Sequence, residues 1–361
     1  MPRGGAVNEP SSEKFSEVEG GPRLLRDVSW LFVAEIVQTC IGLVIIAVLV
    51  RELPAESYGS WMAILAIFQF TSLVNFGFPT YISRTLPADP RLSNYLFRSI
   101  RRIQFLLTPV IFGICSIAAL YSPSLGIQHN PLLILVGVGF LSTVLIQVNR
   151  STLISLGLSN IVVLITLADR LLSLSLVLYS KFWLGSEEIF LLLGFISGPM
   201  AGLLISEIYV RNLINKPRHR GEEGASSKEV VAESSPFLLN LVGPIVFDSF
   251  NRLIIFVSLG AVPLAVFDVA YRVLTAGNSI TRSLRKAMLP VFSNSSDDYL
   301  GNLLKASNLI ALILPMGLLA GHFAGLSIPF VFSSSYDESV QVFFVLLFAW
   351  APSPGSFTMN G

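Results

Sequence analysis

Ten apolar segments, each long enough to cross a lipid bilayer, follow one another along the 361 residues of this chain. The bilayer core offers no hydrogen-bond partners, so a spanning segment satisfies its own backbone as an α-helix of about 20 residues. Only 13% of the residues are charged, against about 25% in a typical soluble domain. We therefore predict an all-α polytopic membrane protein of about ten helices. The expected spans are 28–50, 60–82, 103–121, 132–156, 161–180, 189–210, 237–259, 263–286, 303–325 and 339–359.

Lysine and arginine residues are concentrated in every second connection between the predicted spans. With the N-terminus placed inside, 19 of the 24 basic residues fall in inner connections or the N-terminal tail. Only Arg51 and Lys181 lie outside, and Arg170, Arg252 and Arg272 lie within spans. Positively charged connections stay in the cytoplasm. The count therefore predicts a multi-pass protein of the cell (inner) membrane with a cytoplasmic N-terminus.

The chain divides into two groups of spans. We expect a disordered cytoplasmic tail over 1–27, a six-helix bundle over 28–210, a flexible cytoplasmic linker over 211–236 and a second, four-helix bundle over 237–361. Leu-Pro pairs recur 203 residues apart, and the Gly residues that end the fourth and tenth spans recur 204 residues apart. Both bundles start inside, so the pattern favours a parallel repeat about an axis along the membrane normal.

Several ionisable residues lie inside the predicted spans, where each costs about 2.5–3.5 kcal/mol on insertion scales. Two acid–base pairs at i, i+4 share one helix face each. One interpretation is structural, with neutralised pairs that lock helix packing. The other, which we favour because the charges lie on several helices, is a water-filled translocation cavity between the bundles. The candidate cavity residues are Glu35, Asp169, Arg170, Asp248, Arg252, Asp268 and Arg272.

No enzyme motif is present in the sequence. It contains no Walker A, GxSxG, HExxH or CxxC pattern, and its three histidines are far apart. The outer connections are short, which disfavours a membrane glycosyltransferase or polymerase. We therefore predict no catalytic residues, no metal and no cofactor, with a proton or sodium ion as the possible coupling ion.

The segment after the first span carries a loose family pattern. Leu53, Tyr58 and Gly59 form a Leu-x4-Tyr-Gly turn, and the second span ends in Phe76-Gly77-Phe78. Phe267-Asp268-Val-Ala-Tyr271-Arg272 occurs in the second half. These features resemble the polysaccharide biosynthesis family of flippases, within the multidrug/oligosaccharidyl-lipid/polysaccharide exporter superfamily.

The resemblance implies a flippase with two bundles around a central cavity. Its substrate would be undecaprenyl-pyrophosphate-linked oligosaccharide, moved across the cytoplasmic membrane for O-antigen, lipopolysaccharide, capsule or exopolysaccharide synthesis. Membrane lipids, a polysaccharide polymerase and chain-length proteins would be partners, and nucleic acid would not. The family has twelve or fourteen spans, so the second bundle would be incomplete here. The alternatives are a cation-coupled multidrug exporter and a non-transporting scaffold of a polysaccharide-synthesis complex.

Overall fold

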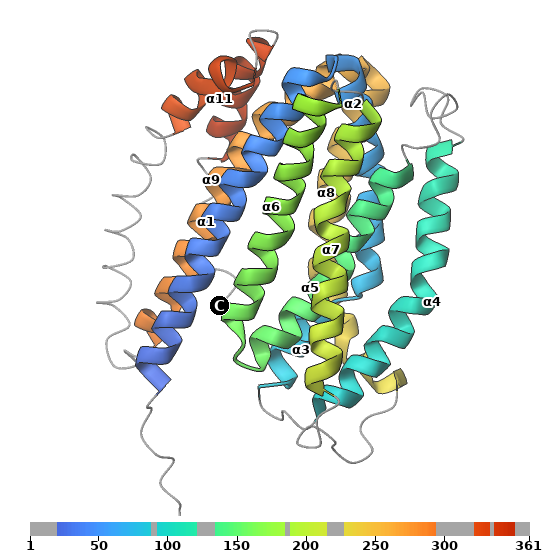
Figure 1. The fold of residues 1–361 in the computed structure, drawn as a ribbon, viewed down its shortest axis with the longest axis vertical. Helices are drawn as coiled ribbons and strands as arrows, with labels where there is room; N and C mark the ends of the chain where they lie inside the picture. Colours follow the sequence, from blue (N-terminus) through green and yellow to red (C-terminus); the bar gives the residue numbers. More distant parts are fainter. Residues whose placement is uncertain are drawn as a thin grey trace, which may run out of the picture.

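The computed structural model describes residues 20–87, 92–120, 134–184, 188–214, 227–293, 321–332 and 336–350. Within these ranges the chain is helical, with no strand. The helices form an elongated, roughly parallel arrangement in which α1 and α9 lie side by side (Figure 1). The elements are α1 (Gly20–Glu52), α2 (Ala55–Phe68), η1 (Gln69–Asn75), α3 (Phe78–Thr85), α4 (Ser93–Leu120), α5 (Ile134–Ser155), α6 (Ser159–Trp183), α7 (Glu188–Ile214), α8 (Ser227–Leu259), α9 (Ala261–Ser293), the helix Gly321–Val331 and α11 (Glu338–Trp350).

Seven stretches of the described helices are long and apolar enough to cross a membrane. They match the first seven predicted spans, and the first of them is Phe32–Glu52. The eighth predicted span lies within α9, and part of the tenth lies in α11. Most of the ninth, 303–325, lies outside the described residues. The all-helical membrane fold is therefore confirmed, whereas the count of ten stays a prediction.

Helices extend into the predicted tail and linker. α1 already begins at Gly20, and α8 begins at Ser227, inside the predicted linker 211–236. Val230 is fully buried there, beside Val210 and Ile214 of α7 in one apolar cluster. Burial of these side chains explains why α7 and α8 continue into the predicted linker. Residues 1–19 and 215–226 lie outside the described residues.

The second predicted span is one membrane crossing built from three helices. α2 passes into the 3₁₀-helix η1, and Phe76 and Gly77 then take left-handed backbone angles of φ 43° and 76°. Glycine adopts such angles without steric cost. α3 then starts with Pro79 in its first turn, where proline is tolerated. The Phe76-Gly77-Phe78 motif therefore marks a break in a spanning helix, and Pro79 is not a mid-helix hinge.

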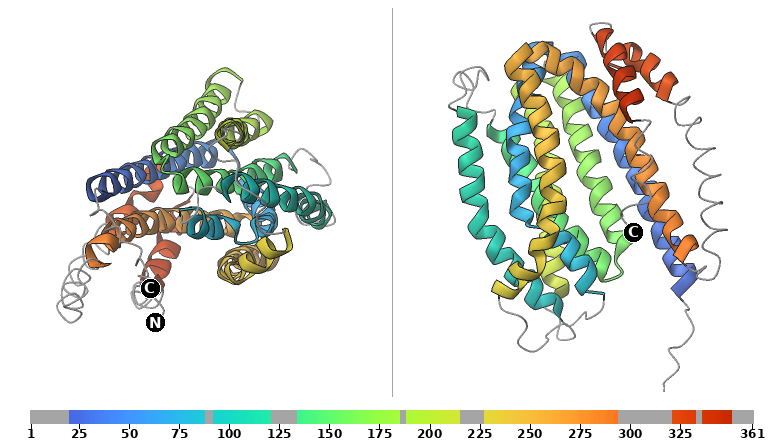
Figure 2. Two further views of the ribbon diagram at one scale, coloured as in Figure 1. Left: turned by 90° about the horizontal axis from the view of Figure 1, so that it is seen from below. Right: turned by 180° about the vertical axis from the view of Figure 1, so that it is seen from behind.

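Two apolar clusters occupy opposite ends of the molecule. One gathers the C-terminal half of α1 with α2, the first turns of α9 and α11. The other gathers α3 with the beginnings of α4, α6 and α8 and the ends of α5 and α7. The view from below and the view from behind show the helices grouped around the middle of the molecule (Figure 2).

Small residues bring α6 and α7 into close contact. Gly194, Gly198 and Gly202 recur every four residues along α7. A Cβ atom on Gly198 would lie 2.0 Å from the carbonyl oxygen of Asp169, and one on Gly202 would lie 2.9 Å from the Asp169 Cβ. Such small-residue stripes let helix backbones approach in membranes. This contact fixes the position of Asp169 and of Arg170 beside it.

Replacing Gly198 with alanine should therefore destabilise the protein. The added methyl group has no room against α6, and overpacking of this kind costs about 1–3 kcal/mol. The matched control is Gly113→Ala in α4, where nothing lies within 4 Å of the added Cβ. Thermal unfolding of the purified variants in detergent should show a lowered midpoint for Gly198→Ala alone. Equal midpoints for the two variants would contradict the packing described here.

Candidate functional site

A cavity of about 460 Å³ lies between five of the first six spans, α4 excepted, and the helices α8 and α9. We call it the interbundle cavity. Side chains from α1, α2, η1, α5, α6, α7, α8 and α9 line it. Five of the seven predicted residues are among its lining residues, namely Glu35, Arg170, Asp248, Arg252 and Arg272. The other two, Asp169 and Asp268, lie behind the wall and bind the lining arginines.

Asp268 of α9 is the centre of the polar network. Its side chain is fully buried and is reached from two other helices as well as its own. The Tyr58 hydroxyl donates to Oδ2 at 2.7 Å, and Arg272 Nε donates to the same oxygen at 2.6 Å. Arg252 Nε lies 3.4 Å from Oδ1. The predicted pair Asp268–Arg272 is therefore formed, and it is joined to Arg252 in one network.

The predicted pair of Asp248 with Arg252 is wrong in its geometry. Arg252 instead turns toward Asp268 and donates from Nη1 to the Gln69 side chain at 3.2 Å. Its guanidinium carbon also lies 5.4 Å from the centre of the Tyr271 ring. Asp248 accepts a hydrogen bond from the Tyr271 hydroxyl. A fully buried carboxylate on α9 thus draws Arg252 away from its neighbour four residues earlier.

Adjacent residues Asp169 and Arg170 of α6 point in different directions, as their spacing predicts. Asp169 is buried and accepts a hydrogen bond from Arg150 Nη2 of α5 at 2.7 Å. Arg170 faces the interbundle cavity, with its Nε 3.6 Å from the Asp169 Oδ1. Arg170 is thus farther from the Asp169 carboxylate than Arg272 is from the Asp268 carboxylate. The guanidinium of Arg170 is therefore more available to a ligand.

One face of α1 lines the same cavity. Glu35, Gln38 and Gly42 all contribute to the wall. Among the described residues that line it, Glu35 and Asp248 are the two carboxylates, and Arg170, Arg252 and Arg272 are the three cations. The surface therefore offers both signs of charge, with the arginines on the three helices α6, α8 and α9.

Some important residues escaped the sequence analysis. Tyr58 was counted as part of a turn, yet it lies in the first turn of α2 and donates to Asp268. Its neighbour Gly59 allows close approach, because a Cβ there would lie 1.9 Å from the Ala261 carbonyl oxygen. Arg150 was counted in a cytoplasmic connection but lies within α5. The sequence did contain a signal for Tyr58, because this residue is the tyrosine of the Tyr-Gly motif. Its side chain reaches the second bundle.

The described helices define a polytopic α-helical membrane protein with a polar cavity between its helices. A solved MATE structure, described as in complex with Br-NRF, matches with a TM-score of 0.51 at 14% identity. The match covers 92% of this chain and 81% of that chain. At this identity the likeness shows the fold alone.

The family follows from the sequence itself. Residues 24–296 match the family described as "Polysaccharide biosynthesis protein". The chain belongs to this family, as the resemblance of its Tyr-Gly and Phe-Gly-Phe segments indicated. No curated protein sequence matches the chain significantly.

Removing the Tyr58 hydroxyl should weaken the contact between the bundles. Tyr58→Phe leaves a buried carboxylate with one donor fewer, which costs about 1–3 kcal/mol. The matched control is Tyr81→Phe, because the Tyr81 hydroxyl donates to Glu233, whose side chain is exposed to solvent. Thermal unfolding in detergent should show a larger drop for Tyr58→Phe. A drop no greater than that of the control would contradict a central role for Asp268.

Proposed function

We propose that this protein is a flippase for undecaprenyl-pyrophosphate-linked oligosaccharide in the synthesis of a surface polysaccharide. The observation that carries the proposal is that arginines from three helices, Arg170, Arg252 and Arg272, line one cavity between two helix bundles. Family membership supports it, because residues 24–296 match a polysaccharide biosynthesis family. The protein would move its substrate without catalytic chemistry, by alternating access between the two bundles.

The arginines suit a diphosphate group. A guanidinium presents five N–H donors in a planar fork that matches phosphate oxygens in pairs. Arg252 and Arg272 share the single carboxylate of Asp268, so their donors exceed the acceptors that Asp268 offers. A volume of about 460 Å³ lies within the range of small-molecule sites, about 300–1,000 Å³. It suits the diphosphate and its nearest sugar, while the polyprenyl chain would remain in the lipid.

The carboxylates of the cavity wall suit a second role, which is the binding of a coupling ion. Glu35 and Asp248 line the wall beside the arginines. A proton or sodium ion that neutralises one of them would raise the net positive charge that the cavity presents to phosphate. We propose that such an ion couples transport to the membrane gradient, with the acids as its acceptors.

A cation-coupled multidrug exporter is the second candidate function. It is favoured by one observation, that the wall offers carboxylates as well as arginines, which suits a cationic ligand at Glu35 and Asp248. The fold of the MATE neighbour is compatible with it. Substitution of the arginines separates the two functions, because a cationic drug has no need of them.

Replacing Arg170 or Arg252 with glutamine should abolish or strongly reduce surface glycan. Each change removes a phosphate-binding group while keeping a polar side chain of similar length. The matched control is Arg84→Gln, at an exposed position outside the cavity. Surface polysaccharide of cells that carry each variant as their sole copy should be compared at equal amounts of membrane-inserted protein.

Normal amounts of surface glycan in both cavity variants would contradict the proposal that Arg170 and Arg252 bind the substrate. Arg272 is less suited to this test. Its removal would leave Asp268 buried with a weaker partner, and breaking a buried ion pair costs about 3–5 kcal/mol.

The proposed orientation in the inner membrane has a direct test. In a chain with Cys40 and Cys115 replaced by alanine, Leu184→Cys and Lys228→Cys place single thiols at exposed positions. If the N-terminus is cytoplasmic, a membrane-impermeant maleimide should label position 184 in intact cells, and position 228 only after permeabilisation. The opposite pattern would reverse the orientation that the arginine and lysine count predicts.

A further inference from the structure

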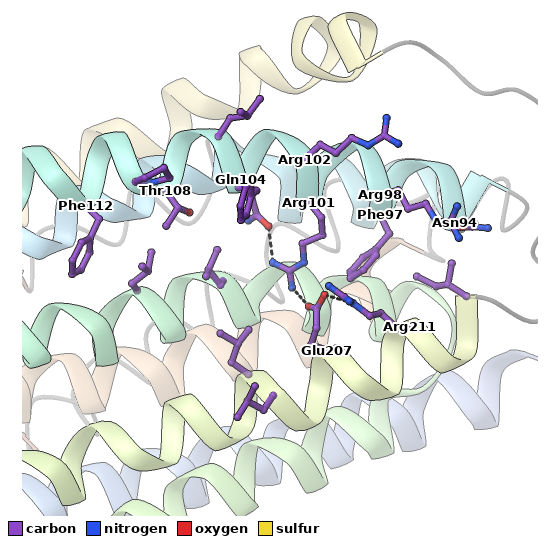
Figure 3. A pocket seen from close by; sticks show the side chains of 18 residues that line it. Asn94, Phe97, Arg98, Arg101, Arg102, Gln104, Thr108, Phe112, Glu207 and Arg211 are labelled. Carbon is purple, nitrogen blue, oxygen red and sulfur yellow. Dashed lines mark hydrogen bonds and ion pairs between the residues drawn. The ribbon is translucent and has the colours of Figure 1, made fainter.

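A second, larger cavity of about 1150 Å³ lies between α4, α5 and α7 on the side of the first bundle. We call it the lateral pocket. Residues from Asn94 to Phe112 of α4 form one wall, and Leu203 to Ile214 of α7 form the facing wall (Figure 3). No residue lines both this pocket and the interbundle cavity. It is therefore separate from the proposed transport site.

One end of the lateral pocket is strongly cationic. Its lining includes Arg98, Arg101, Arg102 and Arg211, and Glu207 is the one acid among the described residues that line it. These charges lie together at the beginning of α4 and the end of α7 (Figure 3). Glu207 is paired with Arg101 and Arg211, and the cationic side chains outnumber the acidic ones among the described lining residues, which makes this end complementary to an anion.

Buried polar groups hold the centre of this cationic end in place. The Arg101 guanidinium donates to Glu207, to Asn149 and, at 2.7 Å, to the Gln104 side chain. Arg211 Nε donates to the other oxygen of Glu207 at 2.9 Å. Glu207 is thus already engaged by two arginines. Within the described residues the Arg101 Nε is buried and makes no hydrogen bond. The site is therefore a built one with donor capacity to spare.

The other end of the lateral pocket is apolar. Phe112, Leu141 and Leu145 line it, and the lining residues Phe105 and Leu204 are 81% and 62% exposed. Arg101 and Phe112 are eleven residues apart on α4, which is about 16 Å along a helix. That is close to the thickness of one leaflet of the hydrocarbon core, about 15 Å. The pocket thus has a charged end at membrane-surface depth and an apolar end at acyl-chain depth.

We propose that the lateral pocket binds one two-chain anionic phospholipid of the surrounding leaflet. The lipid phosphate would lie at the end of the pocket that Arg101, Arg102 and Arg211 line, and one acyl chain would follow the apolar wall along α4. A free phosphate ion would satisfy the arginines but would leave this wall empty. A zwitterionic lipid would fill the apolar end but would match the excess positive charge less well.

The test measures lipid retained by the purified protein. Native mass spectrometry of delipidated protein should be carried out with added phosphatidylglycerol or phosphatidylcholine of identical chains. The lipid-site variant is Arg102→Gln with Arg211→Gln, both exposed side chains of the pocket. The matched control is Arg84→Gln with Lys228→Gln, which makes the same change in charge at exposed positions outside the pocket.

The wild-type and control proteins should bind one phosphatidylglycerol in clear preference to phosphatidylcholine. The lipid-site variant should bind it at least about tenfold more weakly, since each basic residue near an anionic lipid contributes about 1 kcal/mol. Equal binding of the two lipids, or equal loss in both double variants, would overturn the proposal. Full displacement of the lipid by millimolar inorganic phosphate would overturn the lipid assignment and leave a simple anion site. Unchanged thermal unfolding of the lipid-site variant shows that it is folded.

Discussion

The fully buried carboxylate of Asp268 is the interaction on which the arrangement of the two bundles depends. An isolated charge at this depth would be strongly unfavourable, and it is retained only with close partners. Asp268 gathers three of them, Tyr58 from α2, Arg252 from α8 and Arg272 from its own helix. One acid thus ties the first bundle to the second and also aims two arginines at the interbundle cavity. The Asp268 carboxylate therefore serves both the packing of the helices and the proposed function.

The second predicted span packs against both α8 and α9. At one end, Gly59 lets α2 approach the Ala261 carbonyl at the start of α9. At the other, a Cβ on Gly77 would lie 2.7 Å from the Phe237 Cβ of α8. Between these contacts the chain passes through η1, which brings Gln69 to Arg252. The helix backbones are therefore close at these two points, and the polar interbundle cavity lies between the two points.

Much of this arrangement could be predicted from the sequence, because length and hydropathy determine where helices cross a membrane. The first seven spans and the gathering of charges on several helices followed from that rule. The partners of individual charges did not. The i, i+4 spacing was correct for Asp268 and Arg272 but wrong for Asp248 and Arg252. Spacing along one helix says nothing of a stronger partner on another helix, and Tyr58 is 210 residues from Asp268.

The central claim is that the arginines of the interbundle cavity hold the diphosphate of a lipid-linked oligosaccharide during transport. The most direct measurement is translocation of a fluorescent undecaprenyl-pyrophosphate oligosaccharide in proteoliposomes, scored by its protection from a membrane-impermeant quencher. Wild-type protein should translocate the lipid, and an Arg170→Gln/Arg252→Gln double variant, equally well folded and inserted, should not. Equal translocation by the two proteins would contradict the account.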